Sequence, residues 1–571
     1  LRPRGDIHLA LGQQAQPTDD LEQAADLAEA TDDASSRDLL RMRIYDVRGQ
    51  ALLKSRPAEA AASFSDAIAT ALATKQDSTY RAVLHFQRAA ARRNAGDPGA
   101  EDDIAAARKI LHGEVRQALT SDPKRASEPL WTPYFSRFQE QYDELMESRL
   151  EAQDANGAFV YSELARAFEP MQILLQSQSL PPGFRSIETV ADLERARASL
   201  PEDTVILQFL VLPKGTYTWV VTRERITVVP QRATKRDIEG WTSAALESAV
   251  ARQRDPFIRA TRAAYGELFR APLKQAGASK THIVIVPDGP MLGFPFNGLV
   301  GETQEGYLIE RASIAVAGST SPYLYALARD QQLSKDHQPS VLLVGDPAFE
   351  SKRFLRLPFA REEVNELSAG YYRGAEVLVD VGATVPKFLA AVKNKTIIHF
   401  AGHGIASPQD PWQSRLLLAP QGGVSGELNA QKLMKELPKL ERTRLVVLGA
   451  CSSAGGSSVG PQGLAPLVRP FIAANVPAVV GAMWNVKDAS AKRLLVSLHC
   501  HYRHGDDVAV ALRNAQLERL RNHEPAMTWA AFQAVGYAAS PYPRPIALED
   551  PNIEHLCTQN SLLGPDGLPS Q

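Results

Sequence analysis

Two segments decide the fold of this sequence: Ile397-Ile398-His399-Phe400-Ala401-Gly402-His403-Gly404 and Leu445-Val446-Val447-Leu448-Gly449-Ala450-Cys451-Ser452-Ser453. Each is an apolar run that ends at a polar, reactive side chain, the imidazole of His403 and the thiol of Cys451. Ligands bind at the carboxyl ends of strands in a parallel sheet. If the two runs are neighbouring strands, His403 and Cys451 come together, as a cysteine nucleophile and its base require.

Thiol chemistry on a carbonyl needs a thiolate, a group that takes its proton, and donors for the developing oxyanion. Cys451 and His403 supply the first two, and the backbone N–H groups of Gly404 and Cys451 are the predicted donors. Glycines beside both residues keep the approach open, because they carry no side chain. The alternative interpretation is structural: Cys451 is a small buried residue and His403 a turn residue.

Composition predicts a soluble, multi-domain protein. The chain has 571 residues, of which 44% are apolar and 22% charged, and its 63 basic residues nearly balance 65 acidic ones. This balance gives no indication of a nucleic-acid or membrane surface. Three cysteines are too few for a disulfide framework and favour a reducing compartment. With no apolar run of roughly 18 residues and no signal-peptide pattern, we expect a cytoplasmic location. The first residue is Leu1, so we expect a processed or partial chain.

Residues 1–180 are predicted to be helical and possibly incomplete at the N-terminus. They are rich in Ala, Glu, Arg and Leu with apolar spacing near 3.6. The pattern Ala60-x3-Phe64-x2-Ala67 returns 40 residues later as Ala100-x3-Ile104-x2-Ala107, each time just after a turn. Small residues at these spacings let helices pack closely, as in tetratricopeptide-type hairpins. An irregular helical bundle is the alternative.

After residue 180 the sequence pattern changes from helical spacing to a mixture of strands and helices. Residues 181–275 are expected to form a β-meander followed by one helix over residues 235–269. In residues 276–540 strands alternate with helices, which indicates a mostly parallel sheet flanked by helices. Residues 541–571 contain several prolines and are expected to be a tail.

Several motifs, in order, resemble the CHAT family, caspase-like peptidases associated with tetratricopeptide repeats. The two opening segments carry the resemblance together with Val479-Val480-Gly481-Ala482-Met483-Trp484-Asn485-Val486-Lys487-Asp488. Upstream, Ile285-Val286-Pro287-Asp288-Gly289-Pro290 is similar to the family's first strand and turn, and Leu357-Pro358-Phe359-Ala360 to a helix start. The resemblance covers about residues 204–537.

The resemblance implies an α/β caspase-haemoglobinase fold in which His403 is the general base or proton shuttle and Cys451 the nucleophile. It implies a cysteine endopeptidase acting on a protein substrate, with a helical region that binds a regulatory protein or sensor complex. Bacterial relatives are often tied to defence. One departure is Pro461-Gln462-Gly463, where the family often has Gly-Glu-Gly, so a role for that glutamate is in doubt.

Two carboxylates are candidates for a pocket that favours a basic residue before the cleaved bond. Asp346 follows a predicted sheet strand, and Asp488 follows Asn485-Val486-Lys487. The stronger alternatives are that Asp346 starts a turn before Pro347 and that Asp488 caps the following helix.

No metal or other cofactor is expected. Cys500 and His504 lie four residues apart on a predicted helix, but structural zinc needs four ligands and only this pair is visible. A polar helix end explains His504 better. Two other functions use the same domain: a non-catalytic scaffold with a caspase-like domain, and a thiol-dependent acyl transferase or hydrolase of small molecules.

Overall fold

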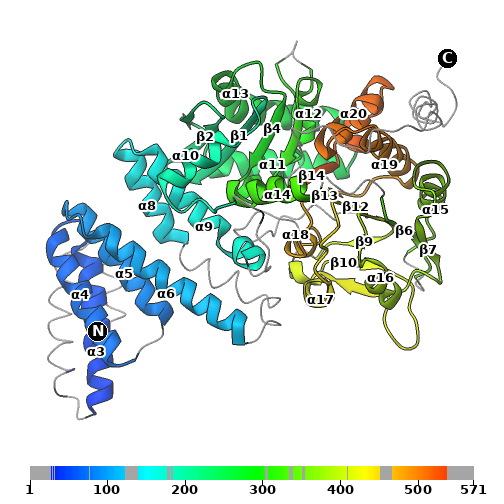
Figure 1. The fold of residues 1–571 in the computed structure, drawn as a ribbon. Helices are drawn as coiled ribbons and strands as arrows, with labels where there is room; N and C mark the ends of the chain where they lie inside the picture. The colour runs from blue at the N-terminus through cyan, green and yellow to red at the C-terminus, as the bar shows by residue number, and fades with distance from the viewer. Residues whose placement is uncertain are drawn as a thin grey trace. The chain divides into compact units, whose positions relative to one another are not determined.

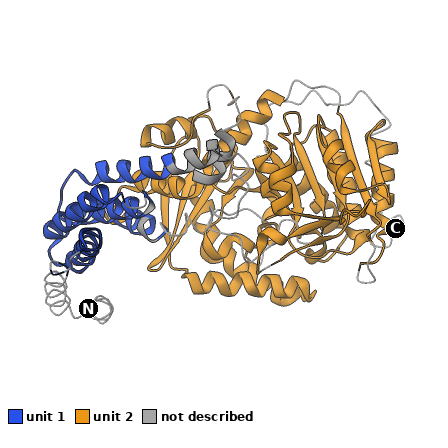
Figure 2. Cartoon of the chain, turned by 90° about the horizontal axis from the view of Figure 1, so that it is seen from below, with its two compact units in different colours: residues 1–128, 134–148 blue, residues 129–133, 149–571 orange. Residues whose placement is uncertain are grey.

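The computed structural model describes residues 28, 30, 33–75, 78–121, 139–175, 181, 184–302, 306–333, 339–349, 354–407, 409–450 and 466–536. The chain divides into two compact units, residues 1–128 with 134–148, and residues 129–133 with 149–571 (Figure 2). We call them unit 1 and unit 2. Cys451 and residues 541–571 lie outside the described residues.

Unit 1 is built from helices. Its described helices are α3 (Ala34–Leu52), α4 (Pro57–Ala73), α5 (Ser78–Asn94), α6 (Ala100–Ser121) and most of α8 (Gln139–Glu151). Successive helices from α3 to α6 contact one another, as antiparallel helical hairpins do. Pro57 occupies the first turn of α4, where a missing N–H costs nothing.

The repeated small-residue pattern lies at the centre of these hairpins. Ala60, Phe64 and Ala67 of α4 are fully buried, and Ala107 of α6 is as well. A methyl group on Gly49 of α3 would come within 2.6 Å of the Phe64 ring, so α3 and α4 pack at a distance that requires glycine. The helical region with tetratricopeptide-like hairpins is therefore confirmed.

Unit 2 contains an 11-stranded sheet in the order β3-β2-β1-β4-β5-β14-β13-β12-β8-β6-β7 (Figure 1). The strands are β1 (Thr204–Leu212), β2 (Gly215–Val221), β3 (Ile226–Gln231), β4 (His282–Val286), β5 (Ser313–Val316), β6 (Val341–Pro347), β7 (Glu376–Asp380), β8 (Ile397–Ala401), β12 (Leu445–Gly449), β13 (Ala478–Ala482) and β14 (Phe532–Gly536). A small sheet of β9 (Gly404–Ile405), β10 (Arg415–Leu417) and β11 (Glu427–Asn429) follows β8.

The large sheet is parallel in two blocks that run in opposite directions. β14 is parallel to β5 but antiparallel to β13, so the strands from β13 to β7 run opposite to β1, β4 and β5. Within each of these blocks the neighbours are parallel, while β1, β2 and β3 pair antiparallel. The carboxyl ends of β6, β8 and β12 therefore share one edge of the sheet, and those of β4 and β5 lie at the other.

Helices cover both faces of this sheet. The helices of unit 2 are α9 (Ala155–Leu175), α10 (Val190–Ala198), α11 (Lys235–Val250), α12 (Arg254–Ala264), α13 (Arg270–Ala276), α14 (Thr320–Leu333), α15 (Pro358–Glu366), α16 (Val385–Ala391), α17 (Ala430–Glu436), α18 (Arg469–Ala473), α19 (Asp488–Arg503), α20 (Val508–Arg521) and α21 (Ala526–Trp529). Leu343 and Val447 belong to the core that α15 and α19 cover, whereas Leu342 and Val446 face α16 and α18. Strands buried on both faces explain the continuous apolar runs.

The sequence-based expectations differ from the structure in several places, and α14 is one helix that was not expected. β5 and β14, which join the two blocks, were not expected as strands. The expected helix over residues 235–269 is broken at Arg252, whose φ is 56°, and continues as α12 and a short π-helix, Tyr265–Phe269. Finally, α9 is helical but belongs to unit 2, where Ser162 accepts a hydrogen bond from Gln208 of β1.

Candidate functional site

The carboxyl ends of three neighbouring strands meet in register beside His403. Ala401, the last residue of β8, lies opposite Gly345 of β6 on one side and Gly449 of β12 on the other. Asp346 is the next residue after Gly345, and His403 comes two residues after Ala401. The strand order thus brings Asp346 and His403 to the same edge of the sheet, as neighbouring parallel strands require.

The His403 ring is held by a backbone carbonyl. Its Nε2 atom lies 2.6 Å from the carbonyl oxygen of Leu355, which can only accept a hydrogen bond. Nε2 therefore carries the proton, and in the neutral ring Nδ1 is left as the basic nitrogen. The ring packs against Phe354 with centroids 5.3 Å apart. The carbonyl of His403 accepts from the N–H of Leu417, which ties it to β10.

Glycines beside the strand ends are needed for close packing. A side chain at Gly449 would meet Cδ1 of Leu495 at 2.9 Å and the carbonyl oxygen of Phe400 at 3.2 Å. A side chain at Gly402 would meet the Phe400 ring at 2.9 Å. Gly404 begins β9 and pairs with Leu416 of β10. Gly449 thus allows β12 to pack closely against β8 and α19, whereas the sequence interpretation had given the glycines a role in substrate access.

Cys451, the predicted nucleophile, lies outside the described residues. The chain is described as far as Ala450, which is buried directly after β12. Of the predicted site, the structure places His403, Gly404, Asp346 and Asp488.

The Asp346 carboxylate is bound within the chain. It accepts hydrogen bonds from Nε and a terminal nitrogen of Arg356 and from the N–H of Leu357, at 2.6–3.2 Å. Arg361 lies 3.5 Å away. The residue is buried and has a left-handed φ of 45°, a conformation that costs a non-glycine residue about 1–3 kcal/mol. Strain of this kind persists where the surrounding structure holds it in place.

Asp488 caps a helix, but a different one from the helix expected. Its Oδ2 atom accepts from the N–H of Phe359 at 3.0 Å, in the first turn of α15. It is itself the first residue of α19, whose N-cap residue is Lys487. Burial raises the pKa of the Asp488 carboxyl, and the negative charges of Glu363 and Asp346 raise it further.

His399 is fully buried in β8 and contacts other titratable groups. Its Nδ1 atom is 3.0 Å from Nε2 of His499, and its Nε2 atom is 2.8 Å from the Glu363 carboxylate. The hydroxyl of Tyr372 lies within hydrogen-bonding distance of Nδ1 of His499, at 2.9 Å. This cluster joins β8 to α15 and α19.

Cys500 and His504 are the pair that was considered for metal binding. Cys500 is buried in α19 and disulfide-bonded. His504 is the C-cap residue of α19, and Gly505 follows with a φ of 102°. Within the described part of the chain, no group of three or more His, Cys, Asp and Glu side chains could hold a metal ion. No helix in the same residues is long and apolar enough to cross a membrane.

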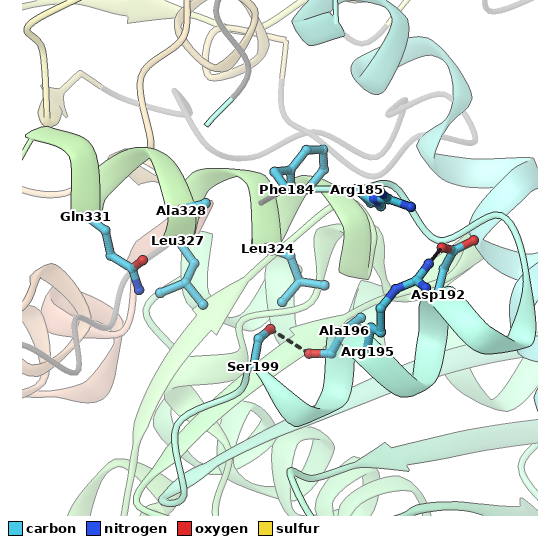
Figure 3. Close-up of a pocket in the computed structure, with 10 residues that line it drawn as sticks. All are labelled: Phe184, Arg185, Asp192, Arg195, Ala196, Ser199, Leu324, Leu327, Ala328 and Gln331. Atoms are coloured by element: carbon cyan, nitrogen blue, oxygen red, sulfur yellow. Dashed lines mark hydrogen bonds and ion pairs between the residues drawn. The ribbon is translucent and has the colours of Figure 1, made fainter. Parts of the chain in front are cut away.

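A cavity of about 430 Å³ lies elsewhere in unit 2, between α10 and α14. Figure 3 shows Leu324 and Leu327 of α14 facing Ala196 of α10 and Ser199, the C-cap residue of that helix. The Ser199 hydroxyl donates to the carbonyl of Ala196. This lining has no histidine or cysteine, and its one hydroxyl is bonded to a backbone carbonyl, so the edge beside His403 is the better candidate site.

Sequence reasoning missed Leu355 and Arg356. Leu355 acts through its carbonyl, which every residue has, so its side chain gives no signal. Arg356 lies just before Leu357-Pro358, a helix start that was recognised, and its partner Asp346 is ten residues away. Only the fold shows that the segment Phe354–Leu357 passes over the ends of β6 and β8.

Known proteins share parts of this sequence. Residues 259–537 match the family model of the CHAT domain. Tetratricopeptide repeat protein 28 of Homo sapiens is 22% identical over 335 residues, 51% of this chain and 14% of that protein. The Mus musculus protein of the same name is 24% identical over 299 residues, 44% of this chain and 12% of that protein. The chain therefore spans a small part of these relatives.

Among solved structures, the Saccharomyces cerevisiae separase–securin complex at 2.6 Å is similar, with a TM-score of 0.43 and 10% identity over 94% of this chain and 49% of that chain. The fold implied by the CHAT resemblance, a mostly parallel sheet flanked by helices and preceded by tetratricopeptide-like helices, is the fold observed. The residues that match the CHAT domain, 259–537, include the segments that carry the resemblance in the sequence.

Proposed function

We propose that this protein is a cysteine endopeptidase that cleaves a protein substrate with Cys451 as nucleophile and His403 as base. One observation carries the proposal: β8 and β12 are adjacent and parallel, with Gly449 opposite Ala401. His403 and Cys451 each follow two residues after this matched pair. Cys451 would supply the thiol that the His403 imidazole deprotonates.

The hydrogen bond that His403 makes leaves the other ring nitrogen available to act as the base. Since Nε2–H donates to Leu355, Nδ1 is free to accept the proton of the Cys451 thiol. The thiolate then attacks the carbonyl carbon of the scissile bond, and the oxyanion accepts hydrogen bonds from the N–H groups of Gly404 and Cys451. His403 returns the proton to the leaving amine, which departs and leaves an acyl-enzyme. A water molecule, deprotonated by His403, hydrolyses the thioester and regenerates the thiol.

The helical unit 1 is the proposed docking region for a regulatory protein or sensor complex. Stacked helical hairpins of the α3–α6 type build extended surfaces that bind proteins. We further propose a bacterial defence setting, in which the partner activates cleavage. The proposed location is the cytoplasm. A disulfide at Cys500 is uncommon in a reducing cytosol, so the redox state of Cys500 in cells tests the location.

The decisive experiment compares the wild-type chain with Cys451→Ala and His403→Ala in a whole proteome, with and without candidate partner proteins. New N-termini are sequenced, and Cys451 is probed with a peptidyl electrophile under reducing conditions. We expect termini and labelling that require both residues. Cys500→Ala, studied under the same reducing conditions, is the matched control, because it removes a cysteine that the proposal does not use. A biological effect that survives Cys451→Ala would instead favour the scaffold function.

A further inference from the structure

The segment Phe354–Leu357 crosses the candidate site and touches it at two points. Leu355 contributes its carbonyl to His403, while its side chain is 78% exposed and has no packing role. The next residue, Arg356, sends its guanidinium to Asp346 and Asp380. The residue after that, Leu357, donates its N–H to Asp346. The carbonyl that holds His403 thus sits directly before two anchored residues.

The anchor is strong for a surface segment. The guanidinium of Arg356 makes several hydrogen bonds to the buried Asp346 carboxylate and donates to the Asp346 carbonyl at 3.1 Å. Paired hydrogen bonds between arginine and a carboxylate fix both position and orientation. A second terminal nitrogen bonds Asp380 at 2.9 Å, at the end of β7. Asp346 in turn lies in β6 between Gly345 and Pro347, which pair with Val379 and Asp380 of β7.

We propose that Asp346 and Arg356 are positioning residues that hold the Leu355 carbonyl against His403 and thereby select the Nε2–H tautomer. The inference rests on the proposed function for its purpose, since that tautomer presents Nδ1 to the Cys451 thiol. It assigns to Asp346 an internal partner, instead of a basic side chain of the substrate. The carbonyl also stabilises the imidazolium that forms when the thiol is deprotonated, because it accepts a hydrogen bond from a cation.

Arg361 provides a matched control. Like Arg356, it lies near both Asp346 and Asp380, at 3.5 and 3.2 Å. It belongs to α15 and is not part of the crossing segment. Arg356→Gln and Arg361→Gln therefore remove the same charge from the same pair of carboxylates, but only the first releases the residue next to Leu355.

The test observes His403 directly in the full chain. Histidine is labelled with ¹⁵N, and the His403 signals, one of 12 sets, are identified by their loss in His403→Gln. Two-bond ¹H–¹⁵N spectra then distinguish the Nε2–H and Nδ1–H tautomers. We expect the Nε2–H tautomer in the wild type and in Arg361→Gln, and a mixture in Arg356→Gln and Asp346→Asn. Circular dichroism verifies that each variant is folded.

The second readout is alkylation of Cys451 by iodoacetamide as a function of pH. In Arg356→Gln the alkylation rate at pH 7 should fall about tenfold, and the pH profile of this rate should move to higher pH. The reason is that the imidazolium formed on deprotonation of the thiol has lost a hydrogen bond. If the Nε2–H tautomer is unchanged in both Arg356→Gln and Asp346→Asn, the positioning role is wrong, however reactive Cys451 is. Faster cleavage after basic residues in Arg356→Gln would also overturn it, by showing that the guanidinium blocks a pocket.

Failure of the proposed function is separately visible. A wild-type Cys451 that is no more reactive than an ordinary thiol, together with a tautomer that responds to Arg356→Gln, rejects the peptidase and keeps the positioning role.

Discussion

Nδ1 of His399 and Nε2 of His499 are 3.0 Å apart, and neither side chain is exposed to solvent. One of these nitrogens must donate and the other accept. If Tyr372 O–H donates to Nδ1 of His499, Nε2 of His499 carries a proton and donates to His399. Nε2 of His399 lies 2.8 Å from the Glu363 carboxylate. A neutral His499 satisfies both of its contacts.

Unfolding should therefore become easier as the pH falls. Burial lowers the pKa of His499 well below its usual value, and the neighbouring His399 lowers it further. Below about pH 6.5 the unfolded chain binds a proton at this residue that the folded chain does not. The free energy of unfolding should fall by up to about 1.4 kcal/mol per pH unit from this group. Urea unfolding at pH 7.5, 6.5 and 5.5 measures it.

His499→Phe should flatten this pH dependence, although it lowers stability at every pH by leaving groups of Tyr372 and His399 unpaired. His504→Gln, at the exposed end of the same helix, is the control and should keep the wild-type slope. Equal slopes in the wild type and His499→Phe would show that His499 is not the titrating group.

Asp346→Asn separates a positioning role from a substrate pocket. If Asp346 acts through Arg356, the substitution weakens its hydrogen bonds and lowers kcat about tenfold for substrates with either arginine or alanine before the cleaved bond. A direct contact with a basic substrate residue would instead raise KM for the arginine substrate alone. Peptide pairs that differ only at this residue, assayed under conditions in which the wild type cleaves, give the ratio.

Gly449→Ala should destabilise unit 2 because the strand ends leave no room for a methyl group. The new carbon would lie 2.9 Å from Leu495 and 3.2 Å from the Phe400 carbonyl. Overpacking of this kind costs about 1–3 kcal/mol. Gly240→Ala, in α11 with no atom within 4 Å of the added carbon, should instead stabilise by about 0.5–1 kcal/mol through helix propensity. A thermal midpoint for Gly449→Ala at or above the wild-type value would contradict the close approach.

The sequence predicted the parts of the fold that local patterns encode. β8 and β12 are runs of large apolar residues buried on both faces, so they could be recognised as central strands. β5 and β14 were not recognised, because β5 has only four residues and a glutamine interrupts the apolar run of β14. The reversal of direction at β14 depends on a pairing between distant segments. Local patterns carry no information on it.

The candidate site, like the fold, could be predicted only in part from local patterns. His403 was predicted as a site residue because an imidazole between two glycines, directly after a strand, is an unusual local pattern. The Leu355 carbonyl and the Arg356 anchor depend on a segment that crosses from β6 to the end of β8, which only tertiary structure reveals. Asp488 illustrates the limit: helix capping was anticipated, but the capped helix is α15, which lies far away in the sequence.

Cys500 is disulfide-bonded, and its partner can be predicted. The chain has two other cysteines, Cys451 and Cys557, and both lie outside the described residues. A peptidase needs Cys451 as a free thiol, because the thiolate is the nucleophile. We therefore expect Cys500 to pair with Cys557.

Alkylation of the folded chain without reductant, followed by peptide mapping, identifies the pairing. The expected result is an alkylated Cys451 and a linked peptide that contains Cys500 and Cys557. In Cys557→Ser, Cys500 should become alkylated on unfolding, and labelling of Cys451 by a peptidyl electrophile should be unchanged. A Cys451–Cys500 link would mean that the oxidised chain has no nucleophile, so that cleavage would require a reductant and Cys500→Ala would remove that requirement.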